Sequence, residues 1–414
     1  MTVPTDQRPA VLAIFVLTYV GLAIGRIPGL KLNRAGIAIL GAIAMMIATR
    51  NATGAIASAV DWPTMFLLFG FFVISAQLRM SGFYDRIAGS ISDRLNAPAR
   101  FLLFLIAVTA GLSAFLNNDI VCFVLTPVVG AAVIRKGINP APFLVALAMA
   151  SNIGAGATLI GNAQNMMIGQ LASLSFLRYM LWSIPPVLLG LGATFFFARI
   201  EAHPGPPALQ LAEADPGTTS YPFDPYHTKK GLAVLAAVIA LFFTSLPREI
   251  VVLVAAGIHF MSRKYRTQDL LALVDWQVLL IFMALFVVSG ALQATGYELD
   301  LVNWLEGRGL DPSKPGNEVL LTAGLTALMG NAPAVMLLVK LVPITHVSVA
   351  RIMGVANSFG GNAIMTASVA NIVVVQQARR QGIVVSLGDF ARLGIPVTIV
   401  ALAGLIGWAV LMGP

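Results

Sequence analysis

The sequence contains little charge. Only 11% of its 414 residues are Asp, Glu, Lys or Arg, whereas 58% are hydrophobic and the mean hydropathy is +0.85. A soluble domain carries about 25% charged residues, so this chain lacks the polar surface that a water-facing globule needs. We therefore predict an all-α polytopic membrane protein whose solvent is the lipid bilayer.

Cysteine is nearly absent as well. The single residue, Cys122, excludes a disulfide framework and any metal site built from several cysteines. Because no nucleophile–base pair and no cluster of metal ligands is evident, we expect no enzyme activity, no metal and no cofactor. The net charge of +8 does not indicate nucleic-acid binding, since the basic residues lie in short loops, where they set membrane orientation.

Apolar segments fill most of the chain. Glycine, proline and asparagine interrupt some of them, and backbone groups freed at membrane depth are tolerated only inside protein or beside a wet cavity. Uninterrupted spans are predicted at 9–29, 34–50, 63–80, 176–199, 229–246, 248–262, 276–295 and 390–412. Four stretches are interrupted: 101–134 at 116–119, 141–170 at 151–156, 318–347 at 330–333, and 351–378 at 357–362.

The two halves of the chain are related in sequence. Asp61-Trp62 recurs as Asp275-Trp276, and an ungapped alignment from there has seven identities in 23 positions. We therefore predict a first repeat at 1–199, a polar linker at 200–228 and a second repeat at 229–414. Further alignment pairs Asn118 with Asn331, Asn152 with Asn357, and Asn165 with Asn371.

The charge distribution predicts the topology. The legs of 101–134 and 318–347 are about 15 residues long, short of the roughly 20 needed to cross a bilayer, so we predict two re-entrant hairpins. Each repeat then has five crossings, the second repeat is inverted, and about 10 segments span the membrane. This arrangement places 18 of 26 basic residues on one side, which should be cytoplasmic. The linker 200–228 is then cytoplasmic, and both termini lie outside.

Asparagine is concentrated at the four breaks. Nine of fifteen asparagines lie in windows that together hold 37 residues. Because amides offer donors and acceptors without full charge, we predict that the breaks meet in a solute site near the bilayer midplane. Helix capping and interhelical contact are the alternative roles for asparagine, and the glycines are expected to shape the backbone. The predicted substrate-binding residues are Asn117, Asn118, Asn152, Asn331, Asn357, Asn362, Gly154, Gly156, Gly360 and Gly361.

Asp119 is the one carboxylate between Phe101 and Ile134. An acid inside the membrane is functional by default, and desolvation favours its protonated form, so we predict that it carries the coupling proton. A helix N-cap is its alternative role. Cys122, one turn further on, is interpreted as packing rather than as an arsenic ligand. A cation could be bound by Ser151, Thr158, Ser358 and Thr366, or these hydroxyls could bond back to their own helices.

The hairpin and break motifs resemble a known family. The run 113–119, followed by Leu125-Thr126-Pro127, resembles the first hairpin of the ion-transporter superfamily, which includes arsenical pump membrane proteins, sodium–proton antiporters and divalent-anion:sodium symporters. The run 151–165 is similar to its first unwound helix, and Gly360-Gly361-Asn362 with Asn371 resembles the second copy. The resemblance implies a scaffold, a mobile part with both hairpins, and elevator-like alternating access. It also implies a homodimer in the symporter branch and an ATPase partner for arsenical pumps.

Substrate charge separates the candidate functions. The predicted site has no basic residue and one carboxylate, which favours a neutral solute or a cation over a dianion. Together with the resemblance, this predicts proton-coupled efflux of a trivalent metalloid, arsenite or antimonite, across the plasma membrane. Three alternatives stay open: a Na⁺- or H⁺-coupled oxyanion or carboxylate symporter, a Na⁺/H⁺ antiporter, and, from another class, an ion channel.

Overall fold

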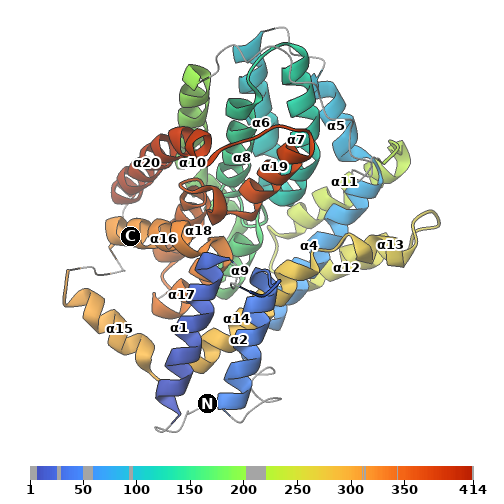
Figure 1. The fold of residues 1–414 in the computed structure, drawn as a ribbon. Helices are drawn as coiled ribbons and strands as arrows, with labels where there is room; N and C mark the ends of the chain where they lie inside the picture. Colours follow the sequence, from blue (N-terminus) through green and yellow to red (C-terminus); the bar gives the residue numbers. More distant parts are fainter. Residues whose placement is uncertain are drawn as a thin grey trace.

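The structure is a computed structural model that describes residues 7–25, 29–49, 59–92, 97–201, 221–309, 311, 314–342 and 344–412. Within these ranges the chain forms nineteen α-helices, one short 3₁₀ helix and no strand (Figure 1). Most of the predicted linker, 202–220, lies outside the described residues.

The helices of the first half follow the predicted segments closely. A Pro near the start of several helices fixes the first turn, and polar caps such as Asp61, which accepts a hydrogen bond from the Thr64 N–H at 2.8 Å, complete it. These helices are α1 (Arg8–Ile24), α2 (Arg34–Ala48), α4 (Trp62–Met80), α5 (Phe83–Ser92), α6 (Pro98–Phe115), α7 (Asn118–Arg135), α8 (Pro140–Ala155), α9 (Ala163–Leu171) and α10 (Phe176–Glu201).

The second half repeats this order of elements. Asp275 caps α14 as Asp61 caps α4, since its carboxylate accepts the Val278 N–H at 3.1 Å. The helices are α11 (Pro225–Leu241), α12 (Arg248–Phe260), α13 (Thr267–Ala272), α14 (Trp276–Gln293), α15 (Tyr297–Glu306), α16 (Pro315–Met329), α17 (Asn331–Leu341), α18 (Val347–Gly360), η1 (Met365–Ala367), α19 (Val369–Arg380) and α20 (Leu387–Met412).

Lipid-compatible helices dominate the described part of the chain. Six of its helices are long and apolar enough to cross a membrane: α4, α6, α7, α10, α14 and α20. Two of these, α6 and α7, are the legs of the first predicted hairpin. They have 18 residues each, so the expected leg length of about 15 residues is wrong and leg length no longer argues for a re-entrant hairpin there. Large apolar side chains such as Leu17, Leu188 and Ile399 are exposed, as expected for surfaces that face lipid. In contrast, every residue of α8 is buried, so this helix occupies the centre of the molecule.

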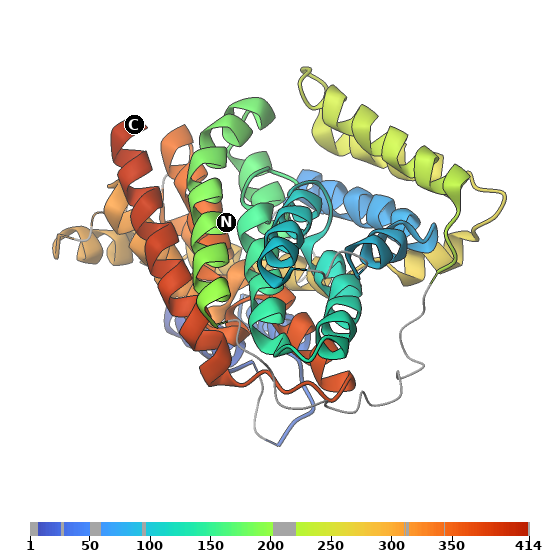
Figure 2. The same ribbon diagram turned by 90° about the horizontal axis from the view of Figure 1, so that it is seen from above.

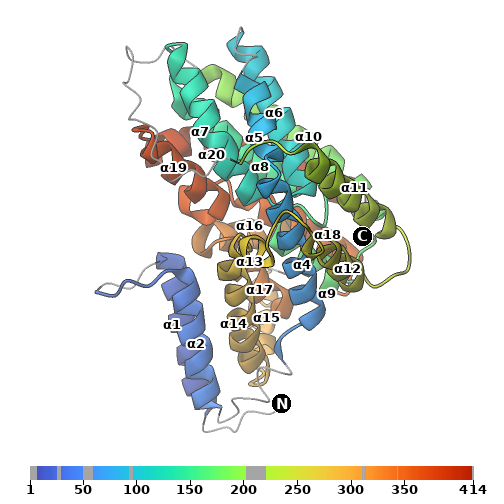
Figure 3. The same cartoon turned by 90° about the vertical axis from the view of Figure 1, so that its right-hand side faces the viewer.

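Contacts between the halves hold the fold together. Helix α2 of the first half packs on α14 of the second, and α12 packs on α4. Helices α10 and α20 lie side by side at one edge, whereas α11 and α12 form the opposite edge (Figure 2). Within each half, the first leg of the hairpin packs on a broken helix: α6 packs on α8, and α16 packs on α18. The α1–α2 pair extends away from the α6–α8 group (Figure 3), with the Arg34 end of α2 nearest the centre of the molecule.

Candidate functional site

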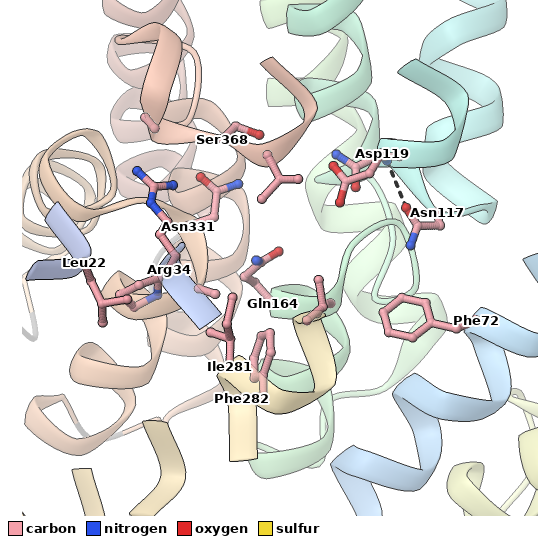
Figure 4. A pocket seen from close by; sticks show the side chains of 17 residues that line it. Leu22, Arg34, Phe72, Asn117, Asp119, Gln164, Ile281, Phe282, Asn331 and Ser368 are labelled. Carbon is pink, nitrogen blue, oxygen red and sulfur yellow. Dashed lines mark hydrogen bonds between the residues drawn. The ribbon is translucent and has the colours of Figure 1, made fainter. Parts of the chain in front are cut away.

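A central cavity lies where the two hairpin tips meet the two broken helices. It has a volume of about 60 Å³, measured as the space open to the centre of a water molecule. At about 10–15 Å³ per water, this space would hold a handful of waters or one small solute. Its walls come from both hairpin tips, from the starts of α9 and α19, and from α1, α2, α4 and α14 (Figure 4). The polar lining residues are Arg34, Asn117, Asn118, Asp119, Gln164, Asn331 and Ser368.

The first hairpin tip presents a free carboxylate. Asn117 is the N-cap of α7, because its side chain accepts the N–H groups of Asp119 at 2.9 Å and Ile120 at 3.3 Å. The alternative role of Asp119 as the cap is therefore wrong. Among the described residues, the Asp119 carboxylate has no hydrogen bond or ion pair with any side chain. Its oxygens are available to a solute.

The second hairpin tip turns at a glycine. Gly330 has φ +92°, a conformation that favours glycine, and α17 begins at the next residue. The Asn331 side-chain oxygen is buried and has no hydrogen-bond partner among the described residues, while its main-chain carbonyl accepts the Asn357 amide at 3.1 Å. Because Asn331 lines the cavity, this unpaired amide is a candidate to bind a donor from a solute.

The two helix breaks occur later in the chain than predicted. Helix α8 continues to Ala155 and α18 to Gly360, so Ser151, Asn152 and Asn357 are helical, and the breaks are 156–162 and 361–368. The hydrogen bonds that these side chains make to neighbouring elements outweigh their low helix propensity.

The predicted glycines shape the backbone around the cavity. A Cβ at Gly154 would lie 2.4 Å from the Ala110 Cα, and one at Gly360 would lie 2.7 Å from the Ala323 Cα, so both allow helices to approach closely. Gly156 and Gly361 terminate α8 and α18. None of the four belongs to the cavity lining.

Three of the predicted asparagines are buried behind the cavity, and two of them, Asn152 and Asn362, belong to one network. The Asn152 amide donates to the side-chain oxygens of Asn362 and Asn371, both at 2.9 Å, and its own oxygen accepts the Ser368 hydroxyl at 2.9 Å. Asn357 donates to the Thr326 hydroxyl at 2.8 Å. Asn152, Asn357 and Asn362 are almost completely buried and absent from the lining. Asn152 and Asn362 join the halves, and Asn357 binds within the second half, whereas Asn117, Asn118 and Asn331 face the cavity.

Equivalent hydrogen bonds recur in the two broken helices. Asn165 donates to carbonyl oxygens 10 and 7 residues earlier, and Asn371 does the same in the second half. In this register Ser151, whose hydroxyl donates to the Asn118 carbonyl, is equivalent to Asn357, whose amide donates to the Asn331 carbonyl. The sequence pairing of Asn152 with Asn357 is therefore wrong by one residue.

Three of the four hydroxyls considered for a cation site donate hydrogen bonds to carbonyl groups of the protein. Ser151 donates to the Asn118 carbonyl at 3.1 Å, Thr158 to the Ala114 carbonyl, and Ser358 to the Gly354 carbonyl at 3.1 Å. Thr366 contributes its main-chain carbonyl to Arg34. A hydroxyl that donates keeps its lone pairs for a cation, but none of the four residues lines the cavity, so a cation there would have to use the hairpin oxygens.

Sequence reasoning missed three polar lining residues: Gln164, Ser368 and, as the charged one among them, Arg34. Its guanidinium donates to the Thr366 carbonyl at 2.9 Å and lies on the wall opposite Asp119 (Figure 4). The expectation of a site without basic residues is therefore wrong. In the sequence, Arg34 stands between the loop that ends at the Asn33 cap and an apolar helix. It therefore resembled an ordinary loop residue. With Asp119 ionised, the two charges on the cavity wall balance.

A wider cavity adjoins the central one. Its volume, measured in the same way, is about 410 Å³, and it shares Phe72, Asn117, Asp119 and Val369 with the central cavity. Arg79 and Asp275 line its outer part. Asp119 therefore lies at the junction between the central cavity and a path toward one face.

Cys122 is free and fully buried below the first hairpin tip. It packs in the main hydrophobic core and does not line either cavity. We expect Cys122→Ser to keep near wild-type transport and to cost about 1 kcal/mol of stability, because only one buried atom changes. Flux measured in liposomes would check this, and lost transport by a well-folded variant would indicate that the thiol binds the solute.

Comparison with known proteins identifies the relatives of this chain. The family model described as citrate transporter matches residues 19–350. An uncharacterized transporter of Mycobacterium tuberculosis, MT2759, is 30% identical over 83% of this chain and 85% of its own length. The silicon efflux transporter LSI3 of Oryza sativa is 32% identical over 40% of this chain and 34% of its own length. The YdaH transporter of Alcanivorax borkumensis has a similar fold, with a TM-score of 0.57, 13% identity and coverage of 98% and 97%.

Proposed function

This chain belongs to the citrate transporter family, and on that premise we propose that it exports a small hydroxylated metalloid acid in exchange for protons. As a member of this family it is a multi-pass membrane transporter and not an enzyme. Arsenious, antimonious and silicic acids are the solutes that we place in its cavity. The plasma membrane is the proposed location.

The central cavity carries this proposal. It is small, it has amide groups on both hairpin tips, and its one cation and one carboxylate sum to no net charge. An uncharged polyhydroxy acid matches each property, because its hydroxyls can donate to amide and carboxylate oxygens and accept from amides and the guanidinium. The similarity to a silicon efflux transporter supports the same class of solute.

Asp119 provides a mechanism for exchange. An ionised carboxylate only accepts hydrogen bonds, whereas a protonated one has lost part of that capacity. A solute whose hydroxyls donate to Asp119 therefore competes with a proton for the same oxygens. If the site opens alternately to the two sides, solute leaves on one and a proton enters from the other.

We propose that alternating access uses an inverted repeat and an elevator-like movement of the hairpins and broken helices past α2, α4, α12 and α14. The repeated element order and the matching hydrogen bonds of Asn165 and Asn371 support this. A helix break that lines a cavity is a feature of such transporters. The proposal leaves open whether the protein has an ATPase partner and whether it forms a homodimer.

Solute uptake into liposomes tests the function. Purified protein would be reconstituted with an acidic lumen, and arsenite, silicic acid, citrate, sulfate and sodium would be offered outside. We expect saturable uptake of the metalloid acids. Uptake of citrate instead, in liposomes whose lumen is more alkaline than the outside, would favour the second candidate, a proton-coupled carboxylate symporter, which the presence of Arg34 in the cavity and the family description support.

The hairpin asparagines are expected to set solute affinity. Asn118→Ala and Asn331→Ala should each weaken solute binding about tenfold, since each removes one or two hydrogen bonds to the solute. Binding to detergent-solubilised protein measures this. Asn317→Ala is the matched control, because its amide bonds to the Gly309 and Asp311 carbonyls away from the cavity. Unchanged affinity in both tip variants would remove them from the site.

The proposed orientation can be tested by labelling. In a Cys122→Ser background, Arg263→Cys should react with an impermeant maleimide only after cells are opened, because its loop belongs to the positive, cytoplasmic side. Leu246→Cys, exposed in the loop between α11 and α12, should react in intact cells. The reverse pattern would invert the orientation.

A further inference from the structure

Two arginines occupy equivalent positions in the two halves. Arg34 is the first residue of α2, and Arg248 is the first residue of α12. The ungapped alignment that pairs Asp61 with Asp275 also pairs these arginines. Helices α2 and α12 take matching roles, since α2 packs on α14 and α12 packs on α4. The arginines are thus repeat-related residues of the scaffold.

Each arginine binds main-chain carbonyl groups in the opposite half. Arg34, in the first half, donates to the Thr366 carbonyl just before α19. Arg248, in the second half, donates to the carbonyl of Gly169 at 3.3 Å and to that of Leu174, at the end of α9. A guanidinium has five N–H donors, so both arginines can bind further oxygen atoms.

The carbonyl partners are not equivalent. In the register that pairs Asn165 with Asn371, Ile160 corresponds to Thr366, while Val375 and Arg380 correspond to Gly169 and Leu174. Arg34 therefore contacts one broken helix at the level of the cavity, whereas Arg248 contacts the last turn of α9 and the residues just after it, at the end away from the cavity. At 1.5 Å per helical residue the two levels differ by on the order of 15 Å.

We propose that a different arginine completes the solute cavity on each side of the membrane: Arg34 in the state seen here and Arg248 in the state open to the opposite side. Inverted-repeat transporters change sides by moving one repeat or bundle against the other, and in this proposal the two halves thereby exchange their conformations. That exchange places Arg248 at the Ile160 carbonyl beside the first hairpin tip, and moves Arg34 to the Val375 and Arg380 carbonyls. This inference rests on the proposed alternating access and deepens it.

The ligand of both arginines is an oxygen atom of the solute, either a hydroxyl or a carboxylate. In the present state Arg34 has one main-chain acceptor and faces the cavity, which leaves donors for such an oxygen. The cavity would therefore contain one guanidinium and one carboxylate whichever side of the membrane it opens to. Solute affinity on each side would depend on a different residue.

Sided kinetics in oriented liposomes test this proposal. For arsenite or citrate, whichever the wild type transports, the half-saturating concentration would be measured from both sides. We expect Arg34→Ala to raise it roughly tenfold only on the face that carries Arg79 and Asp275, and Arg248→Ala to raise it similarly only on the other face. Arg34→Lys and Arg248→Lys should recover part of each loss. Arg266→Ala, in an exposed pair with Asp269, is the control.

Equal effects on both faces, or no effect of Arg248→Ala in folded protein, would overturn the proposal. A cross-link covers the case in which Arg248→Ala does not fold. In a Cys122→Ser background that keeps Arg248, a bismaleimide with the reach of an arginine should join cysteines at 34 and 375 whenever the protein visits the second state, and cysteines at 34 and 366 in the state seen here. Linkage of the second pair alone, under all conditions, contradicts the proposal. Failure of the wild type to transport any solute would count against the proposed function, and the cross-link would then decide the inference alone.

Discussion

Asp119→Asn is expected to abolish solute accumulation driven by a proton gradient while solute binding survives. The substitution keeps the size of the side chain and its place at the junction of the two cavities, and α7 keeps its Asn117 cap. The asparagine amide does not take up or release a proton at the pH of such assays. The solute therefore no longer competes with protons for the site. Uptake into acid-loaded liposomes and binding to the same preparation measure the two properties separately.

Two comparisons make this result specific. Asp119→Glu should keep partial coupling, because it retains a carboxyl group with a shifted position. Asp389→Asn removes a carboxylate that bonds to Ser386 near the surface, and it should leave coupling intact. If the Asp119→Asn protein still concentrates solute with the proton gradient as its one energy source, another residue carries the proton.

Asn152→Leu is expected to destabilise the protein more than any substitution at the cavity wall. Leucine fills the volume but leaves the Asn362 and Asn371 oxygens and the Ser368 hydroxyl without the bonds they make to Asn152. Buried polar groups without partners cost about 1–3 kcal/mol each, and membrane interiors reduce this, so we expect a loss of about 2–4 kcal/mol.

Thermal unfolding in detergent would measure this loss. Asn139→Ala is the matched control, because Asn139 caps the same helix by accepting the Ala141 N–H at 3.1 Å, and losing a cap costs about 1 kcal/mol. The Asn152 variant should unfold well below the control. Equal melting temperatures would show that the network contributes little, and a folded Asn152→Leu protein with lost affinity would place this amide in the site.

Local sequence signals were sufficient to predict the hairpin tips. Asn117-Asn118-Asp119 combines a helix cap with residues that disfavour an unbroken helix, and Gly330 permits a positive φ that other residues resist. Both tips lie where they were predicted, and both line the central cavity. The concentration of asparagine at the breaks also identified the region, because amides rarely occur at membrane depth without partners.

Features that depend on tertiary contacts could not be predicted in this way. The ends of α8 and α18 are set by bonds from Asn152 and Asn357 to other elements, which no local pattern encodes. The same bonds decide which asparagines face the solute and which join the halves. Arg34 reaches the cavity because α2 packs on α14, so its role required the arrangement of the two halves.

Solute-induced proton movement is the most direct test of the exchange mechanism. Liposomes containing the wild-type protein and a trapped pH dye would be prepared with an acidic lumen, and arsenite or silicic acid would then be added outside. Proton exchange predicts that lumenal pH rises as the solute enters, in saturable fashion, and that Asp119→Asn liposomes show no rise. Solute entry without any change in lumenal pH, or with further acidification, would contradict proton-coupled export through this cavity.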